Sequence, residues 1–168
     1  MARWRSPAER SSPYITPEGA RGLKHELKEL WQLRRREVVP ALQAAAAEGD
    51  RSENAEYIYR KRQLAGIDRR IRYLSKRLDE VEVVHHRPQR LDRIHFGATV
   101  SLQDEGGVIT RYRIVGADEI DSDTDKGYIS LDSPMARAML NKGLDDEVKL
   151  RLGDSIDIYY ITAISYPE

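Results

Sequence analysis

Eight residues between positions 57 and 81 follow one another at alternating intervals of three and four, and this spacing limits the possible folds more than any other feature. They are Tyr57, Arg60, Leu64, Ile67, Ile71, Leu74, Leu78 and Val81. Such intervals place side chains on one stripe of an α-helix, and a stripe kept over more than three repeats is typical of a coiled-coil seam. We therefore predict a long helix from about Ser52 to about Val83 that packs along this stripe.

A second long helical pattern precedes this one. Thr16 suits the N-cap and Pro17 the first helical position. Pro40 lies inside the pattern, and because proline removes a hydrogen bond and crowds the preceding turn, we predict a kink near residues 36–40. Gly49 is placed to end the helix, so a few residues would join two antiparallel helices. The stripe of this first helix comprises Leu23, Leu27, Leu30, Arg34, Val38, Leu42 and Ala45.

Beyond residue 93 the pattern changes to short segments typical of strands, rich in β-branched and aromatic residues. Ser133 as N-cap, followed by Pro134, indicates one short helix among them. The predicted fold class is α+β, an antiparallel two-helix coiled coil followed by a small antiparallel-sheet domain. The predicted parts are a disordered N-terminal extension at 1–13, the coiled coil at 14–84 with a tip near 48–56, a linker at 85–93 and the sheet domain at 94–168.

Charges balance over the whole chain but not along it. The 28 basic residues match the 28 acidic ones, yet residues 57–78 carry eight bases against Asp68 alone. Residues 79–168 carry ten bases and eighteen acids. A solvated helix face is one interpretation of the basic stretch, and contact with nucleic-acid phosphates is the other. Few acids lie within one turn to neutralise these bases, which favours the second.

Several classes of protein are disfavoured by what the sequence lacks. There is no cysteine, so disulfides, thiolate metal sites and thiol nucleophiles are excluded. No apolar run approaches the roughly 20 residues of a membrane span, and the basic N-terminus lacks the apolar core of a secretory signal. We therefore expect a cytoplasmic protein with no membrane partner.

The stretch EGDRSENAEY, residues 48–57, gathers carboxylates at the turn between the two helices. One interpretation is structural: Asp50 caps the second helix and Glu53 completes a capping box. The alternative is functional: Asp50, Glu53 and Glu56, spaced by three, project to one side of the helix and offer oxygen ligands. Two or three such ligands hold Mg²⁺ only weakly, so the tip would be half of a metal site that another macromolecule completes.

Three segments resemble a known family. GDRSENAEYIYRKRQLAGIDRRIRYLSKRL is similar to the tip and second helix of the bacterial transcript cleavage factors, the Gre family. ISLDSPMARAMLNKGLDDEV resembles that family's C-terminal segment, and with YITPEGARGLKHELKEL the resemblance covers about residues 14–166 in collinear order. It implies a coiled coil followed by an FKBP-like domain. The domain would dock on bacterial RNA polymerase while the coiled coil enters the polymerase's secondary channel.

The resemblance also implies a role for each site residue. The polymerase would remain the enzyme and cleave the 3′ end of backtracked nascent RNA, so that arrested complexes resume transcription. Asp50 and Glu53 would act in trans as catalytic and metal-holding residues, sharing the polymerase's second Mg²⁺, with no cofactor bound permanently. The implied tip supports are Ser52, Asn54 and Glu56. The residues implied to lie beside the RNA are Arg60, Lys61, Arg62, Arg69 and Arg70, and those implied to dock on polymerase are Ser133, Pro134 and Arg137.

Two departures from the family pattern concern the C-terminal domain. Asn141 and Asp145 stand where the family usually has glycine. Because Asn and Asp tolerate left-handed turns, we expect the fold to be retained.

Other interpretations stay open. The chain could dock on polymerase and modulate it without cleavage, or it could be a chaperone or peptide-binding module with a coiled-coil arm. Weak self-association along the seam edges is possible as well. The acids of residues 118–125 lack the central glycine and final glutamate of a calcium loop, so we expect a solvated loop. His85 and His86 are expected to lie at a helix end rather than in a metal site.

Overall fold

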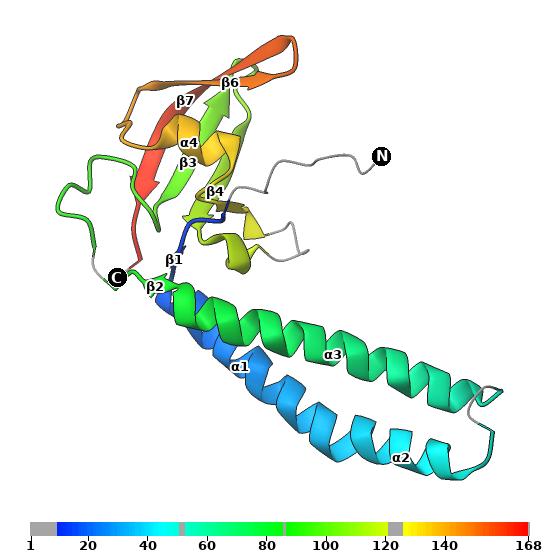
Figure 1. Ribbon diagram of the computed structural model, residues 1–168. Helices are drawn as coiled ribbons and strands as arrows, with labels where there is room; N and C mark the ends of the chain where they lie inside the picture. The colour runs from blue at the N-terminus through cyan, green and yellow to red at the C-terminus, as the bar shows by residue number, and fades with distance from the viewer. Residues whose placement is uncertain (1–9, 51–52, 86, 121–125, 168) are drawn as a thin grey trace, which may run out of the picture. The chain divides into compact units, whose positions relative to one another are not determined.

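The computed structural model describes residues 10–50, 53–85, 87–120 and 126–167. These residues form two compact units, shown in Figure 1. One unit comprises residues 18–81, and the other comprises the chain up to Pro17 together with the chain from Glu82 onward. None of the helices in the described ranges combines the length and apolar character that crossing a membrane requires.

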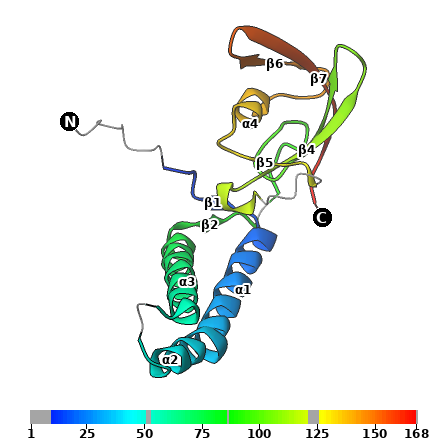
Figure 2. The same ribbon diagram turned by 90° about the vertical axis from the view of Figure 1, so that its right-hand side faces the viewer.

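The unit of residues 18–81 is a helical hairpin, and Figure 2 shows its two arms side by side. The first arm consists of α1 (Pro17–Leu33), a π-helical turn (Arg34–Val38) and α2 (Val39–Ala47), and the second is α3 (Ala55–Glu80). Glu26 pairs with Arg70, whereas Arg34, further along the first arm, pairs with the earlier Asp68. The arms are therefore antiparallel, as predicted.

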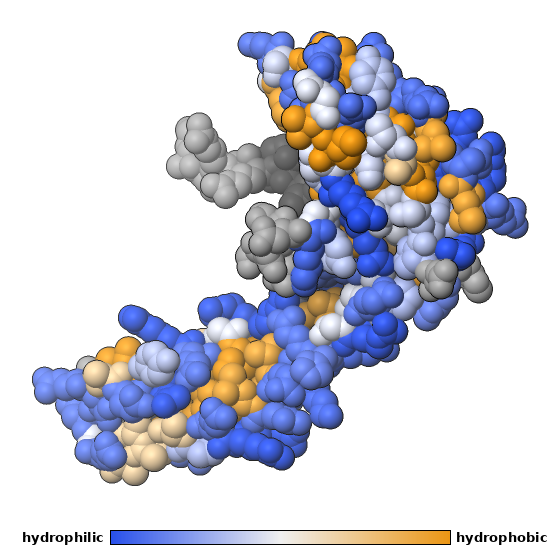
Figure 3. Space-filling view, turned by 180° about the vertical axis from the view of Figure 1, so that it is seen from behind, coloured by the Kyte–Doolittle hydropathy of each residue, from blue (hydrophilic) through white to orange (hydrophobic). Residues whose placement is uncertain are grey.

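Hydrophobic packing along the predicted seam holds the two arms together. All eight seam residues of α3 are buried or half-buried, and Leu74 is fully buried. Val38, also fully buried, packs with Ile67 and Ile71 at the centre of this contact. Figure 3 shows a hydrophobic strip on the hairpin between hydrophilic borders. Because each fully buried aliphatic side chain contributes about 1.5–3 kcal/mol, packing rather than helix propensity stabilises the hairpin.

The disturbance expected at Pro40 takes the form of a π-helical turn. The Val39 N–H donates to the carbonyl of Arg34, five residues earlier. In a regular α-helix, Pro40 would leave the Arg36 carbonyl without a donor and its ring would crowd that carbonyl. The wider turn relieves this conflict, and α2 then resumes with Pro40 in its first turn, where proline is tolerated.

The second unit contains a five-stranded sheet in the order β5-β4-β3-β7-β6. Neighbouring strands are antiparallel except β4 and β5, which are parallel, so the sheet is mixed rather than antiparallel throughout as predicted. The connection over residues 116–127 supplies the dozen or so residues that a parallel crossover needs. The elements are β3 (Thr99–Asp104), β4 (Ile109–Val115), β5 (Tyr128–Ser130), α4 (Pro134–Met139), β6 (Glu147–Leu152) and β7 (Ser155–Ser165).

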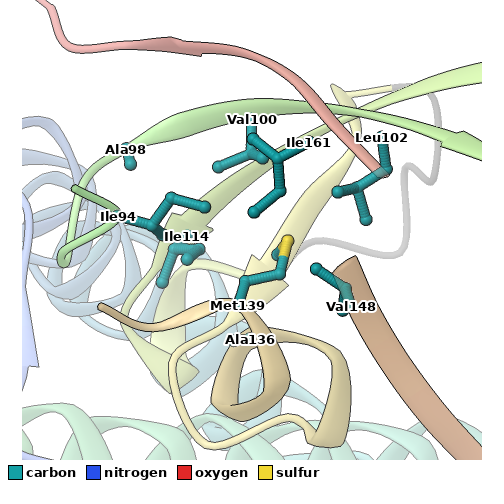
Figure 4. Close-up of a cluster of buried hydrophobic side chains, with 9 residues drawn as sticks. All are labelled: Ile94, Ala98, Val100, Leu102, Ile114, Ala136, Met139, Val148 and Ile161. Atoms are coloured by element: carbon teal, nitrogen blue, oxygen red, sulfur yellow. The ribbon is translucent and has the colours of Figure 1, made fainter. Parts of the chain in front are cut away.

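One face of this sheet packs against α4 to form the hydrophobic core, shown in Figure 4. Alternate residues of β3, Val100 and Leu102, point into it, and α4 contributes Ala136 and Met139. The remaining members are Ile94, Ala98, Ile114, Val148 and Ile161. The small sheet domain with one short helix is therefore present, and the other face of its strands is left for polar and functional side chains.

Asn141 and Asp145 adopt the left-handed backbone expected of them from the sequence. Asn141 has φ of 65° and Asp145 has φ of 64°. Their N–H groups donate to the carbonyls of Ile94 at 2.8 Å and Ile161 at 2.9 Å, respectively. These bonds join the turns after α4 to the core residue Ile94, which precedes β3, and to Ile161 of β7, so both positions make the left-handed turns that glycine would make.

The ends of the predicted coiled coil belong to the sheet unit. β1 (Tyr14–Ile15) pairs in parallel with β2 (Glu82–Val83), whereas the prediction placed residues 14–84 wholly in the coiled coil. Residues 1–9 of the predicted extension lie outside the described residues. Ser12, within the same predicted extension, donates its N–H to Asp132 at 2.8 Å.

The predicted linker at 85–93 also makes contacts with the sheet unit. Arg87 donates to the carbonyls of Pro167 at 2.9 Å and Tyr166 at 3.1 Å. The Tyr166 hydroxyl donates to the carbonyl of Arg93 and accepts from the N–H of His95. Burial raises the pKa of Tyr166 above its usual value of 10.0, the largest of several effects on this group. These bonds attach the start of the domain to its C-terminal end.

Candidate functional site at the tip of the hairpin

The loop between α2 and α3 carries the two acids singled out from the sequence. The cap residue Glu48 ends α2, and Gly49 follows with φ of 128°, a conformation that favours glycine. A side chain at Gly49 would meet no atom within 4 Å, so backbone conformation rather than space selects glycine there. Asp50 and Glu53 are both exposed. Ser52, predicted to support the tip, lies outside the described residues.

Asn54 joins the two arms at this loop. Its side-chain oxygen accepts from the N–H of Tyr57 at 3.0 Å, which makes it the N-cap of α3. Its side-chain amide donates to the carbonyl of Ala45 near the end of α2 at 2.8 Å. One side chain thus satisfies an orphan N–H of α3 and a terminal carbonyl of α2, and it closes the loop that carries Asp50 and Glu53.

This arrangement corrects two sequence predictions. Asp50 is not the N-cap and no capping box with Glu53 forms, because α3 begins at Ala55 and Asn54 holds the cap position. For the same reason Asp50 and Glu53 precede the helix, so the helical spacing with Glu56 does not set their directions. Glu56 lies in the first turn of α3, where the helix dipole stabilises a negative charge, and its carboxylate accepts a hydrogen bond from Arg60 at 2.7 Å.

The tip offers carboxylate oxygens but no complete metal site. Among the described residues, no group of three acidic, histidine or cysteine side chains lies close enough to hold a metal ion. Mg²⁺ prefers octahedral oxygen coordination and is usually bound by one or two carboxylates plus waters or phosphate. Asp50 and Glu53 can therefore supply only part of the coordination that such an ion requires.

The basic residues of α3 are more nearly neutralised than the sequence indicates. Besides the Arg60–Glu56 pair, Arg70 makes a two-bond contact with Glu26 of α1 at 2.6 and 2.9 Å. Arg77 is 8% exposed and so belongs to the seam rather than to the surface. Exposed ion pairs contribute little, about 0–1 kcal/mol, so a phosphate can displace them. Lys61, Arg62 and Arg69 are exposed.

The basic residues do not all share one face of α3. At about 100° per residue, Arg60 and Lys61 lie off the face that Arg62, Arg69 and Arg70 occupy. Tyrosines flank these three arginines, with Tyr59 58% and Tyr73 47% exposed. We name this surface the Tyr–Arg face, and its residues are Tyr59, Arg62, Gly66, Arg69, Arg70 and Tyr73.

Two members of the Tyr–Arg face, Tyr73 and Gly66, were missed by sequence reasoning. Tyr73 stands fourteen residues after Tyr59, which places it about 21 Å further along the same face. A side chain at Gly66 would have room, with only Arg69 Nη2 at 3.8 Å. Counting helical positions between the tyrosines would have found this face from the sequence.

The predicted docking residues lie at the start of α4. Ser133 is the N-cap, and its hydroxyl accepts from the N–H of Ala136 at 3.2 Å. Pro134 occupies the first turn, as predicted, and both Pro134 and Arg137 are exposed. Because Ala136 and Met139 anchor α4 in the core, these residues are presented on a rigid support.

The acidic run at 118–125 contains one residue with a structural role. The Glu119 carboxylate accepts from the N–H groups of Gly116 at 2.7 Å and Thr16 at 3.0 Å, and also from the Thr16 hydroxyl. It therefore ties the segment before α1 to the sheet unit instead of lying in a solvated loop. Asp121, Asp123 and Asp125 lie outside the described residues, as does His86, while His85 is exposed.

Comparison with known proteins gives the chain a family. A family model described as "Transcription elongation factor, N-terminal" matches residues 13–83, and one described as "Transcription elongation factor, GreA/GreB, C-term" matches residues 88–166. Transcription elongation factor GreB of Xanthomonas axonopodis pv. citri is 55% identical over 99% of this chain and 98% of that protein. GreB of Pseudomonas aeruginosa is 50% identical over the same shares.

A solved structure is also similar. GreA factor homolog 1 of Thermus thermophilus is 23% identical, covers 93% of this chain and 99% of its own, and has a TM-score of 0.41. The two family models together span nearly the whole sequence, and the GreB relatives match it almost from end to end. The chain therefore belongs to the GreA/GreB family of transcription elongation factors.

Proposed function

We propose that this protein binds bacterial RNA polymerase and stimulates the polymerase's own cleavage of backtracked RNA 3′ ends, which returns arrested complexes to elongation. One observation carries the proposal: Asp50 and Glu53 are exposed on a loop at the end of a hairpin, and Asn54 holds that loop closed. Membership of the elongation-factor family supports it. On this proposal the polymerase is the enzyme, and the protein acts in the cytoplasm.

Asp50 and Glu53 would complete the set of oxygen ligands around a Mg²⁺ ion that the polymerase binds only in part. Asp50 and Glu53 would hold a Mg²⁺ ion jointly with groups of the polymerase, because two carboxylates alone bind this ion weakly. When bound, Mg²⁺ supplies positive charge that activates water and stabilises the leaving oxygen of the RNA. The contribution of this chain is to present the two carboxylates next to Asn54, whose side chain joins the end of α2 to the start of α3. Glu56, already bonded to Arg60, supports the first turn of α3.

The Tyr–Arg face lies beside the extruded RNA. Arg62 and Arg69 contact phosphates, and Arg70 exchanges Glu26 for a phosphate at small cost. Arg60 and Lys61 contribute charge from neighbouring positions on the helix surface. The exposed rings of Tyr59 and Tyr73 can stack on unpaired bases, a contact that tolerates any sequence.

Docking on the polymerase uses the exposed start of α4. Pro134 and Arg137 make the contact, and Ser133 fixes the first turn that presents them. This division of roles separates the two units, since the sheet unit gives affinity and the hairpin gives activity. A change at the tip should therefore leave binding to polymerase intact.

The experiment is RNA cleavage in a backtracked elongation complex with the protein added. The double variant Asp50→Asn/Glu53→Gln removes both charges with little change of shape, and we expect it to bind polymerase but to lose stimulated cleavage. Each single variant should also raise the Mg²⁺ concentration needed for half-maximal cleavage. Glu48→Gln, at a neighbouring exposed acid, is the matched control and should remain active.

Full cleavage by the double variant would refute the proposed role of the acids. Binding without any stimulated cleavage by the unmodified protein would instead favour a modulator that docks on polymerase. The two outcomes can be told apart because both the binding of the protein and the cleavage of the RNA are measured on the same elongation complexes.

A further inference from the structure

The sheet unit holds a cavity of about 390 Å³ that the proposed function does not use. Its volume falls within the range of small-molecule pockets, roughly 300–1,000 Å³. The side chains that define its chemistry come from three adjacent strands and the residues just before β5. They are Thr99, Arg111, Arg113, Lys126 and Tyr128, with Gly127 between the last two.

Strand register places this cavity on the face of the sheet opposite the core. Thr99 pairs with Arg113, and Arg113 pairs with Tyr128, so these three side chains share one face. Their neighbours Val100 and Ile114 point the other way and are fully buried. Two of the lining side chains, Arg111 and Lys126, are exposed, so a ligand in solvent can reach them.

The cavity concentrates positive charge within an acid-rich part of the chain. Among the described residues that line it, three are basic and none is acidic. Residues 79–168 as a whole carry eighteen acids and ten bases. Cations gathered in a hollow with low-dielectric walls raise the local potential and attract anions more strongly than the same charges scattered on a surface.

Side-chain contacts position Arg113, and a close backbone approach positions the segment that carries Lys126. Arg113 Nη1 donates to the Tyr128 hydroxyl at 3.4 Å, and its guanidinium lies 5.6 Å from the centre of the Tyr128 ring. Gly127 has φ of 63°, and a Cβ there would lie 2.4 Å from the carbonyl oxygen of Arg111. Only glycine lets the chain pass this close to β4, which keeps the neighbouring Lys126 beside the arginine strand.

We propose that this cavity binds a phosphate group, presented by a nucleoside phosphate or by a nucleic-acid backbone. The planar fork of arginine matches phosphate oxygens with two parallel hydrogen bonds, lysine adds a point charge, and the Thr99 hydroxyl adds a further donor. The site belongs to the sheet unit and does not depend on the tip acids. It is therefore independent of the cleavage proposal.

The test is a titration of the isotope-labelled full chain followed by backbone amide resonances. The probes are inorganic phosphate, adenosine monophosphate and a short ribo-oligonucleotide without terminal phosphates. We expect saturable shifts at Lys126, Gly127 and Arg113. A charge-assisted hydrogen bond is worth about 1.5–3 kcal/mol, so Arg111→Gln should weaken binding about tenfold or more.

Arg151→Gln is the matched control, since Arg151 is an exposed arginine at the other edge of the same sheet and does not line the cavity. It should leave the affinity unchanged. In the ligand-free spectra, Val100 and Ile114 amide resonances at the same positions as in the unsubstituted protein verify the fold of both variants. Saturation by the monophosphate alone identifies a nucleotide site, and saturation by the oligonucleotide identifies a backbone site. Absence of saturable shifts with all three probes, or equal affinity in Arg111→Gln, would overturn the proposal.

Discussion

Replacing Asn54 by alanine should loosen the loop that carries Asp50 and Glu53. The change removes the N-cap of α3, which costs about 1 kcal/mol, and the bond to the Ala45 carbonyl, worth about another 1 kcal/mol. The expected loss of about 2 kcal/mol corresponds to a roughly 30-fold increase in the open form of the loop. Asn54→Asp keeps the cap oxygen but loses the amide donor, so it should lose only about half as much.

Hydrogen exchange measures this loss directly at the amide that Asn54 caps. Protection of the Tyr57 N–H should fall about 30-fold in Asn54→Ala and several-fold in Asn54→Asp. The reason is that losing either hydrogen bond of Asn54 favours local opening of the helix start. The Ile71 amide, in the middle of α3, serves as the internal control and should keep its protection. If the Tyr57 amide were equally protected in all three proteins, the argument that Asn54 closes the tip would be refuted.

Three further predictions concern other parts of the molecule. Burial raises the pKa of Tyr166, so the stability that this residue contributes is complete below pH 10.0 and is lost as the pH rises through the folded-state pKa. Tyr166→Phe should therefore flatten the alkaline fall in the free energy of unfolding, and an unchanged slope would contradict this. Pro40→Ala should change the free energy of unfolding, measured by denaturant titration, by no more than about 1 kcal/mol, because the π turn already accommodates the proline ring. A gain in stability near ~3 kcal/mol would show that the turn leaves the ring in conflict with the helix. Tyr59→Ala should weaken binding of a short single-stranded RNA about tenfold in fluorescence anisotropy through lost stacking, and equal affinity of the two proteins would contradict this.

The long helices could be predicted because burial repeats along them. Ile67, Ile71 and Leu74 recur at the spacing of one helical stripe, and all three are buried. The N-cap could not be chosen by the same reasoning. Asp50 and Asn54 are equally good caps in isolation, and the contact that distinguishes them reaches the Ala45 carbonyl on the other arm.

Contacts between residues far apart in the chain also could not be predicted from the sequence. Nothing within one turn of Arg70 shows that Glu26, forty-four positions earlier, neutralises it. The parallel direction of β5 was equally hidden, since three residues are too few to show an alternation. Glu119 looked like one acid in a polar loop, yet its oxygens accept hydrogen bonds from Thr16, more than a hundred positions away.

The stripe of the first arm does contain one clue that connects Pro40 to the tip. Six steps of a regular seam cover three heptads, roughly 21 residues, whereas Leu23 to Ala45 covers 22, one residue more. A π turn accommodates one additional residue, and Val38 at its end and Ala45 beyond it lie on the seam at 0% and 3% exposure. Since the Ala45 carbonyl must face α3 to accept from Asn54, a regular helix would rotate it by about 100° and remove that bond. The placement of Asp50 and Glu53 therefore depends on the turn before Pro40 as well as on the loop in which they lie.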